Sequence, residues 1–234
     1  MKFRFAVLAC IGLFGVSGSL LAAELNVYSA RKEALIKPLL DKFSADTGVT
    51  VNLVTGKADA LITRMQSEGQ FSPADVLLTT DAGRLVRAKS AGLTQAATAP
   101  GINDLVPAFQ RDSEGHWYAL TMRARPIMYA PGKVDVSKIS SILDLAKPEW
   151  KGQICIRSSS NIYNQSMVAA LTLSIGEEAT EAWAEGIVSN MARAPKGGDL
   201  DQIKAVAAGQ CTIAVANTYY LAGMLDSDNA TERE

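Results

Sequence analysis

The alternation of strand patterns with helix patterns limits the fold of this chain more than any other feature of its sequence. In the first half, strand-like and helix-like segments follow one another at residues 25–28, 32–46, 49–54, 57–68, 75–79 and 81–90. Gly48 and Gly69 follow the first two helix patterns, as expected where a helix ends. Such alternation produces parallel βαβ units with helices on both faces of a sheet, so we expect an α/β fold.

The second half of the chain repeats this alternation. Its strand patterns lie at residues 153–156 and 212–216, and its helix patterns lie at 161–173, 177–189 and 199–208. We therefore predict an N-terminal α/β lobe over residues 24–130 and a second α/β lobe over residues 131–234. Tyr28, Thr79, Arg157 and Tyr219 each lie at or just after the end of a strand pattern. Because ligands bind beyond the carboxyl ends of such strands or between lobes, these residues predict a single cleft.

The first 23 residues have the composition of a secretory signal peptide. A basic start at residues 1–4 is followed by an apolar stretch at 5–21 and by a small-residue cleavage site at Ala22 and Ala23. A membrane anchor is the weaker alternative, because the apolar stretch contains several glycines and serines and leads directly into the processing site. We therefore expect a periplasmic protein.

Charge and cysteine content exclude several classes of protein. The chain has 23 Lys and Arg residues against 24 Asp and Glu residues, so nothing indicates nucleic acid or an anionic membrane surface as a partner. After cleavage, Cys155 and Cys211 are the remaining cysteines, and an even count in an exported protein predicts a disulfide. Two buried free thiols are the alternative. Because His116 is the only histidine, a Cys/His zinc site cannot be assembled.

Two adjacent tyrosines, Tyr219 and Tyr220, follow the apolar strand pattern at residues 212–216. A phenolate is a hard oxygen donor that suits a trivalent cation such as Fe³⁺, and a bound cation can remove the phenol proton well below its ordinary pKa near 10. This pair in a secreted chain therefore indicates an iron binder. Half-buried packing of the two rings is the alternative.

A polar segment at residues 157–166 joins a strand pattern to a helix pattern. Its serines and asparagines supply helix caps and free amide donors, which favour an anion or an oxygen-rich ligand at the start of the helix. Tyr163 lies in the first helical turn and can reach into the cleft. A plain capping sequence with Tyr163 packed on the surface is the alternative.

Three arginines are candidates for binding an anion. Arg123 and Arg125 flank one alanine after a strand pattern, and Arg31 follows the first strand. A guanidinium offers a planar fork that fits carboxylate, carbonate or phosphate. Solvated surface arginines are the alternative reading. We find no nucleophile motif and no convincing acid–base pair, which favours a binding protein over an enzyme.

Several segments together resemble the ferric-iron-binding periplasmic proteins, which are the solute-binding components of bacterial iron(III) ABC transporters. The resemblance covers the mature chain and rests on residues 26–31, 74–79, 122–125, 155–166 and 211–220. The last two segments are specific to that family, whereas the first three occur more widely among solute-binding proteins.

The resemblance implies a two-lobed periplasmic binding protein fold, type II-like, with mixed sheets flanked by helices that closes on Fe³⁺. The residues matching the family's iron ligands are Tyr163, Tyr219 and Tyr220. Arg123 and Arg125, together with Arg31, would hold a synergistic anion, often carbonate. The resemblance is also consistent with a Cys155–Cys211 disulfide. It implies a monomer that delivers iron to an ABC permease in the inner membrane.

The chain departs from the family pattern in two places. Many members add a histidine or tyrosine after the first strand, where this chain has Arg31, Lys32 and Glu33. Members usually continue on the order of a hundred residues past the tyrosine pair, so we expect the C-terminal part of the family fold to be missing. The alternatives are a binding protein for an oxyanion, a thiamine-like molecule or a polyamine, a secreted transferase or hydrolase, and a truncated inactive remnant.

Overall fold

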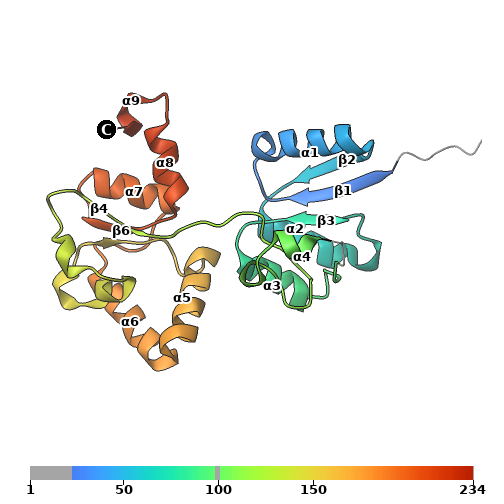
Figure 1. Cartoon of the computed structure of the whole chain (residues 1–234). Coiled ribbons are helices and arrows are strands. Elements are labelled where there is room, and N and C mark those ends of the chain that lie inside the picture. Colours follow the sequence, from blue (N-terminus) through green and yellow to red (C-terminus); the bar gives the residue numbers. More distant parts are fainter. Residues whose placement is uncertain (1–22, 98–100, 234) are drawn as a thin grey trace, which may run out of the picture.

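The computed structural model describes residues 23–97 and 101–233, which form two α/β lobes joined by an extended segment (Figure 1). The predicted signal peptide lies outside the described residues, except for Ala23. In chain order the elements are β1 (Glu24–Ser29), α1 (Glu33–Thr47), β2 (Thr50–Thr55), α2 (Ala58–Glu68), β3 (Val76–Leu78), α3 (Ala82–Ser90), α4 (Ile102–Leu105), β4 (Ile127–Tyr129), β5 (Ile154–Cys155), α5 (Ile162–Ile175), α6 (Glu177–Asn190), α7 (Asp199–Ala207), β6 (Ile213–Val215), α8 (Thr218–Leu225) and α9 (Ala230–Arg233).

The first lobe contains a parallel sheet in the order β2-β1-β3. Helices α1 and α2 connect its strands, as the alternation predicts. The chain crosses from β1 to β2 on one side of β1 and then returns past β1 to form β3 on the other side. The direction of the crossovers therefore reverses beside β1. The carboxyl ends of β1 and β3 therefore border the crevice where ligands bind in open α/β sheets.

The second lobe contains a mixed sheet in the order β4-β6-β5. Strand β5 runs parallel to β6, whereas β4 runs antiparallel to it, with Met128 opposite Ala214. Strand β4 ends at Tyr129 and already belongs to this sheet, so the change of lobe precedes residue 127 rather than following residue 130. The crossing segment is the extended stretch before β4 (Figure 1).

The cores of the two lobes differ in size. The second lobe has a large buried cluster that includes Trp150, Ile154, Trp183 and Ile213. The first lobe has a smaller cluster, in which Tyr28, Leu61 and Met65 are buried. The Tyr28 side chain, which the sequence assigns to the cleft, lies in this core at 1% exposure and donates to Glu68 Oε1 at 2.9 Å. That expectation is wrong because Tyr28 is still inside the sheet, one residue before β1 ends.

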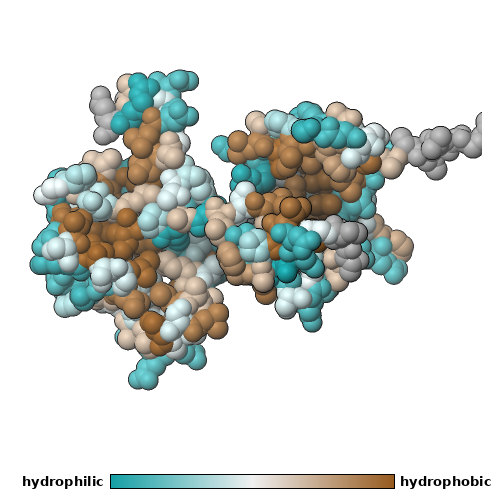
Figure 2. Space-filling view, viewed as in Figure 1, coloured by the Kyte–Doolittle hydropathy of each residue, from teal (hydrophilic) through white to brown (hydrophobic). Residues whose placement is uncertain are grey.

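The apolar face of α1 is only partly covered. Ile36 is buried against the sheet, but Leu35 and Leu39 are 64% and 57% exposed. Figure 2 shows apolar surface gathered beneath α1 on this lobe. The amphipathic spacing thus identifies the helix correctly, while three strands cover only part of its apolar stripe.

The lobes touch where α3 meets α5. Ser166 Oγ on α5 donates to Asp81 Oδ1 at the start of α3, and Arg87 donates to Gln165 Oε1, each at 2.5 Å. Gly83 makes the approach possible, since a Cβ there would lie 2.9 Å from Ile162 Cδ1. The first turn of α5 is therefore held against the first lobe.

Candidate functional site

The tyrosine site is built from the starts of two helices in the second lobe. Tyr163 lies in the first turn of α5, where the Asn161 side chain accepts a hydrogen bond from its backbone N–H at 3.0 Å. Tyr219 lies in the first turn of α8, directly after buried strand β6. The two phenol oxygens are 3.4 Å apart. The structure thus brings together two side chains that are 56 residues apart in the sequence.

Tyr220, the next residue on α8, packs its ring against Tyr219. Its ring centroid is 4.4 Å from that of Tyr219, with the planes tilted by 35°. The ring also packs against the cluster of Ile203, Ala216 and Met224, which fixes its position on α8. After burial and the contact with Tyr163, Tyr220 also contributes to the raised pKa of Tyr219.

The phenols of Tyr163 and Tyr219 have pKa values that are shifted in opposite directions. Burial opposes ionisation of Tyr163, but hydrogen bonds from Tyr219, Thr80 and Arg123, together with the charge of Arg123, lower its pKa. The pKa of Tyr219 is raised by burial and then by its hydrogen bonds to Tyr163 and Tyr220. The two hydroxyls share one hydrogen bond, so loss of a proton from one phenol affects loss of a proton from the other.

Arg123 faces the tyrosines directly. Its guanidinium carbon lies 4.9 Å from the ring centroid of Tyr163 and 6.0 Å from that of Tyr219, within the range of cation–π attraction. Its nearest described carboxylate oxygen is on Asp81, at 4.0 Å. Arg123 therefore keeps donors that can face an anion beside the phenols.

Arg125 is placed beside the site but is already bound. It donates to Asp199 Oδ2 at 2.6 Å, to Asn217 Oδ1 at 3.2 Å and to Asn164 Oδ1 at 2.7 Å. Those bonds use both terminal nitrogens of its guanidinium. The sequence places Arg123 and Arg125 in one anion site, whereas the structure gives them different surroundings.

An open cavity of about 690 Å³ lies between the lobes beside Tyr163. Residues that follow strands border it: Arg31 after β1, Thr79, Thr80 and Asp81 after β3, and Asn217 after β6. Leu35, Leu39, Leu77, Leu85 and Leu120 form an apolar wall. Arg31, the third predicted anion ligand, is exposed on the first-lobe side of this cavity.

The sequence reasoning missed the buried polar group under the tyrosines. Asp199 has the pattern of a helix cap, but it is the first residue of α7 and its side chain is fully buried. Asn164 and Asn217 are also buried and contact Arg125. Local sequence contains no signal for this burial, because the partners of Asp199 come from three separate segments, at Arg125, Arg157 and Asn217.

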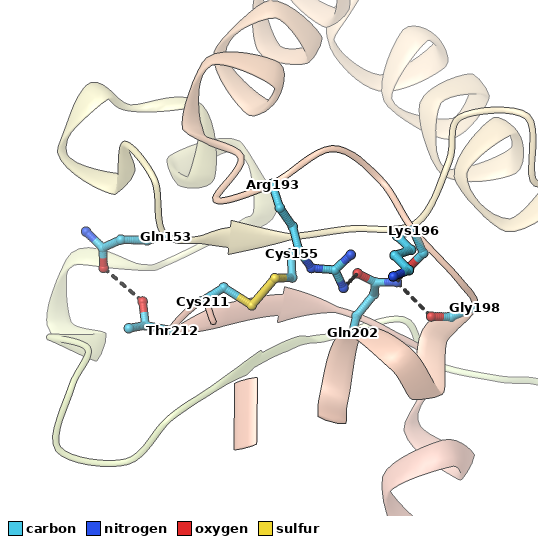
Figure 3. Close-up of a disulfide and its surroundings, with 8 residues drawn as sticks. All are labelled: Gln153, Cys155, Arg193, Lys196, Gly198, Gln202, Cys211 and Thr212. Atoms are coloured by element: carbon cyan, nitrogen blue, oxygen red, sulfur yellow. Dashed lines mark hydrogen bonds between the residues drawn. A yellow bond between two sulfur atoms is a disulfide. The ribbon is translucent and has the colours of Figure 1, made fainter. Parts of the chain in front are cut away.

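The predicted disulfide is confirmed (Figure 3). Cys155 ends β5 and Cys211 precedes β6, with their Cα atoms 6.0 Å apart. Beside the bond, Thr212 Oγ1 donates to Gln153 Oε1 at 2.9 Å. The bond therefore joins the two parallel strands whose continuations lead to Tyr163 and to Tyr219.

Two absences apply to the described residues. No group of three or more His, Cys, Asp or Glu side chains in that part of the chain could hold a metal ion. Within the same residues, every helix is too short or too polar to span a lipid bilayer.

Comparison with known proteins gives consistent matches. The model of a family described as bacterial extracellular solute-binding proteins matches residues 25–224. Iron uptake protein A1 of Synechocystis sp. is 48% identical over 210 residues, which are 90% of this chain and 58% of that protein. The Fe(3+)-binding periplasmic protein of Serratia marcescens is 34% identical over 229 residues, covering 94% of this chain and 67% of that protein. The chain thus spans about three-fifths to two-thirds of the length of these relatives.

Solved structures match across both lobes. The FutA (IdiA) protein of Trichodesmium, in complex with iron and citrate, has a TM-score of 0.86 at 48% identity, covering 90% of this chain and 67% of that one. The ferric binding protein of Campylobacter jejuni has a TM-score of 0.82 at 39% identity, covering 89% and 66%. The expected two-lobed α/β fold is confirmed.

Proposed function

The chain belongs to the family of bacterial extracellular solute-binding proteins, and we propose that it captures Fe³⁺ in the periplasm for delivery to an ABC-type permease of the inner membrane. In this proposal Tyr163, Tyr219 and Tyr220 bind the ion. The chain acts as a binding protein and catalyses no reaction. Relatives named for iron uptake and Fe(3+) binding support the choice of cargo.

The observation that carries the proposal is the 3.4 Å separation of the Tyr163 and Tyr219 hydroxyls. A small hard cation with oxygen ligands at about 2 Å holds neighbouring ligands roughly 3 Å apart. The two phenols therefore need only a small adjustment to share one ion. Three phenolates balance the charge of Fe³⁺, so the metal centre becomes neutral before any further ligand binds.

The remaining coordination positions fall to a synergistic anion, carbonate or a small carboxylate. Arg123 faces Tyr163 and Tyr219 and can hold such an anion, while Arg31 lies on the first-lobe side of the same cavity. Arg125 acts differently, because its donors are bound to Asp199, Asn164 and Asn217. The citrate in the Trichodesmium FutA structure supports a carboxylate in this role.

Closure of the lobes follows from the division of ligands between them. The tyrosines belong to the second lobe, and Arg31 belongs to the first. An ion that binds the tyrosines, with an anion that contacts the first lobe, has a higher affinity for the closed state and shifts the population toward it. The permease then receives the closed, iron-loaded form.

The test is addition of ferric citrate to the purified chain. Phenolate-bound Fe³⁺ gives a visible charge-transfer band, and we expect a coloured one-to-one complex. Tyr219→Phe or Tyr220→Phe should remove most of the band. Each should also weaken binding beyond the roughly 10- to 100-fold that follows loss of a supporting contact around a metal. Tyr129→Phe, which changes an exposed tyrosine at the end of β4, is the matched control. A colourless wild-type mixture, or unchanged colour and affinity in both site variants, would defeat the proposal.

A small organic solute is the second candidate, because the leucine wall and volume of the cavity exceed what a bare ion needs. Arg31 and Arg123 would bind its anionic group and Tyr163 would stack on it. Calorimetric titration with thiamine monophosphate, an organic solute that carries such a group, separates the two candidates. Binding of thiamine monophosphate without iron, together with no coloured ferric complex, would favour the organic solute.

A further inference from the structure

Asp199 is a fully buried carboxylate directly beneath the tyrosine site. Its Oδ2 accepts from Arg125 at 2.6 Å and from the backbone N–H of Asn217 at 2.8 Å. Its Oδ1 accepts from Arg157 at 3.1 Å. One side chain therefore joins the segment before β4, the strand end before α5 and the start of α8.

The partners of Asp199 lead to both tyrosines. The guanidinium carbons of Arg157 and Arg125 lie 5.2 Å and 5.9 Å from the ring centroid of Tyr163. Arg125 also holds Asn164, the residue after Tyr163, at 2.7 Å. On the other side, Asn217 precedes Tyr219 by two residues, and its side-chain amide lies 3.5 Å from the Tyr219 hydroxyl.

The charges of the group make the carboxylate difficult to replace. The side chains of Arg125 and Arg157 are only 12% and 17% exposed, and Asp199 is their one carboxylate partner among the described residues. The Nε atoms of both arginines are buried without a hydrogen-bond partner in the described structure. The orientation of the Arg157 guanidinium therefore depends on its bond to Asp199. Arg125 shares its donors between Asp199 and the side-chain oxygens of Asn164 and Asn217, so Asp199 supplies its one charged acceptor among the described residues.

We propose that Asp199 is a positioning residue for the metal site: it orients Arg125 and Arg157 under Tyr163 and holds the start of α8, which together set the distance between the Tyr163 and Tyr219 hydroxyls. This inference rests on the proposed function only in the identity of the cargo. The hydrogen bonds that Asp199 accepts from both sides of the site involve only atoms of this chain. Arg125 then serves as the link to Tyr163 rather than as an anion ligand.

The main test replaces the carboxylate with an amide of the same shape. Asp199→Asn keeps the volume but has a single acceptor oxygen for three donors. We expect the ferric charge-transfer band to shift and weaken per bound iron, and a competing chelator to remove iron at about tenfold lower concentration, as for other residues that support metal ligands. The control is Asp144→Asn, which removes a carboxylate bound to Ser140 and Lys147 away from the tyrosines. Asp144→Asn should lower the melting temperature. It should leave unchanged the ferric charge-transfer band and the chelator concentration that removes half of the iron.

A double variant keeps the test decisive if Asp199→Asn folds poorly. Asp199→Asn with Arg157→Gln removes one negative and one positive charge, so the net charge of the buried group is unchanged. We expect the melting temperature to recover while the band remains altered. The inference would be overturned if the folded single variant, or the double variant, had the same ferric charge-transfer band as wild type and lost half of its iron at the same chelator concentration.

The iron-free protein separates this inference from the proposed function. Carbon-13 labelling of the six tyrosines gives ring signals that Tyr163→Phe and Tyr219→Phe assign. Asp199→Asn should move the signals of Tyr163 and Tyr219, and Asp144→Asn should not. If wild type fails to bind iron but these signals move, the function is wrong and the positioning role stands. If they stay in place, the positioning role is wrong whatever the cargo.

Discussion

Ser166 Oγ donates a hydrogen bond to Asp81 Oδ1 at 2.5 Å, and this contact ties the tyrosine-bearing helix α5 to the first lobe. Asp81 also accepts from the backbone N–H of Gly83 at 3.0 Å, and it is the one non-glycine residue of the described chain with a positive φ, at 80°. A non-glycine residue in such a conformation is strained and persists only where its surroundings hold it. Here the holding contacts come from both lobes.

Removal of this contact should loosen the two lobes. Ser166→Ala leaves Asp81 with its cap to Gly83 but without its bond to α5, a loss of roughly 1 kcal/mol. We expect a larger share of open molecules in small-angle scattering and a severalfold faster release of iron to a chelator. Ser174→Ala is the matched control, since its hydroxyl bonds within α5 to Ala170. Equal release rates for the two variants would contradict a role for the Asp81–Ser166 contact in lobe closure.

The sequence predicts those parts of the fold that depend on neighbouring residues. The βαβ alternation identifies α1, α2 and the strands between them, because apolar spacing within one segment sets the element. It does not show that β4 joins the second sheet, since its partner β6 lies far along the chain. The boundary between the lobes therefore falls earlier than the pattern indicates.

The same limit applies to the site. Tyr163, Tyr219 and Tyr220 stand out locally, because phenols at the starts of helices after strands are unusual. Asp199 does not stand out, because an aspartate at the start of a helix is common and its burial depends on Arg125 and Arg157. The different surroundings of Arg123 and Arg125 are equally hidden, since the two residues are separated by one alanine.

Arg123 should control the dependence of iron binding on the anion. Its guanidinium stacks on Tyr163 and has no carboxylate closer than Asp81 at 4.0 Å among the described residues. Loss of a charge-assisted bond of about 1.5 kcal/mol corresponds to roughly a tenfold change in affinity. In wild type, bicarbonate or citrate should increase the apparent iron affinity, and in Arg123→Gln that increase should be about tenfold smaller. Arg111→Gln, whose side chain bonds to the Asn103 carbonyl, is the control. An unchanged anion dependence in Arg123→Gln would assign the anion to another residue.

The disulfide should stabilise the second lobe without taking part in binding. Cys155 and Cys211 close a loop with a sequence separation of 56 residues, for which loop entropy gives about 4 kcal/mol. The double variant Cys155→Ala with Cys211→Ala should have a free energy of unfolding lower by about 4 kcal/mol, seen as a lower denaturation midpoint. The folded variant should keep its ferric charge-transfer band. A reductant should shift the midpoint of wild type and leave that of the variant unchanged. A colourless but folded variant would show that the bond also positions the tyrosines.

Acid should release the iron, and the slope of iron affinity against pH should show whether Tyr219 loses its proton when iron binds. The pKa of Tyr219 is raised by burial and by its bonds to Tyr163 and Tyr220, so its phenol carries a proton throughout the neutral range in the iron-free chain. Binding must expel that proton, and each expelled proton changes the apparent affinity by up to about tenfold per pH unit, with weaker binding at lower pH. Wild type should therefore lose its colour over a narrow acid range. Tyr219→Phe has one fewer proton to expel, so its residual binding, followed by chelator competition at several pH values, should vary less steeply by about one proton. Identical slopes for the two proteins would mean that Tyr219 keeps its proton and is not an iron ligand.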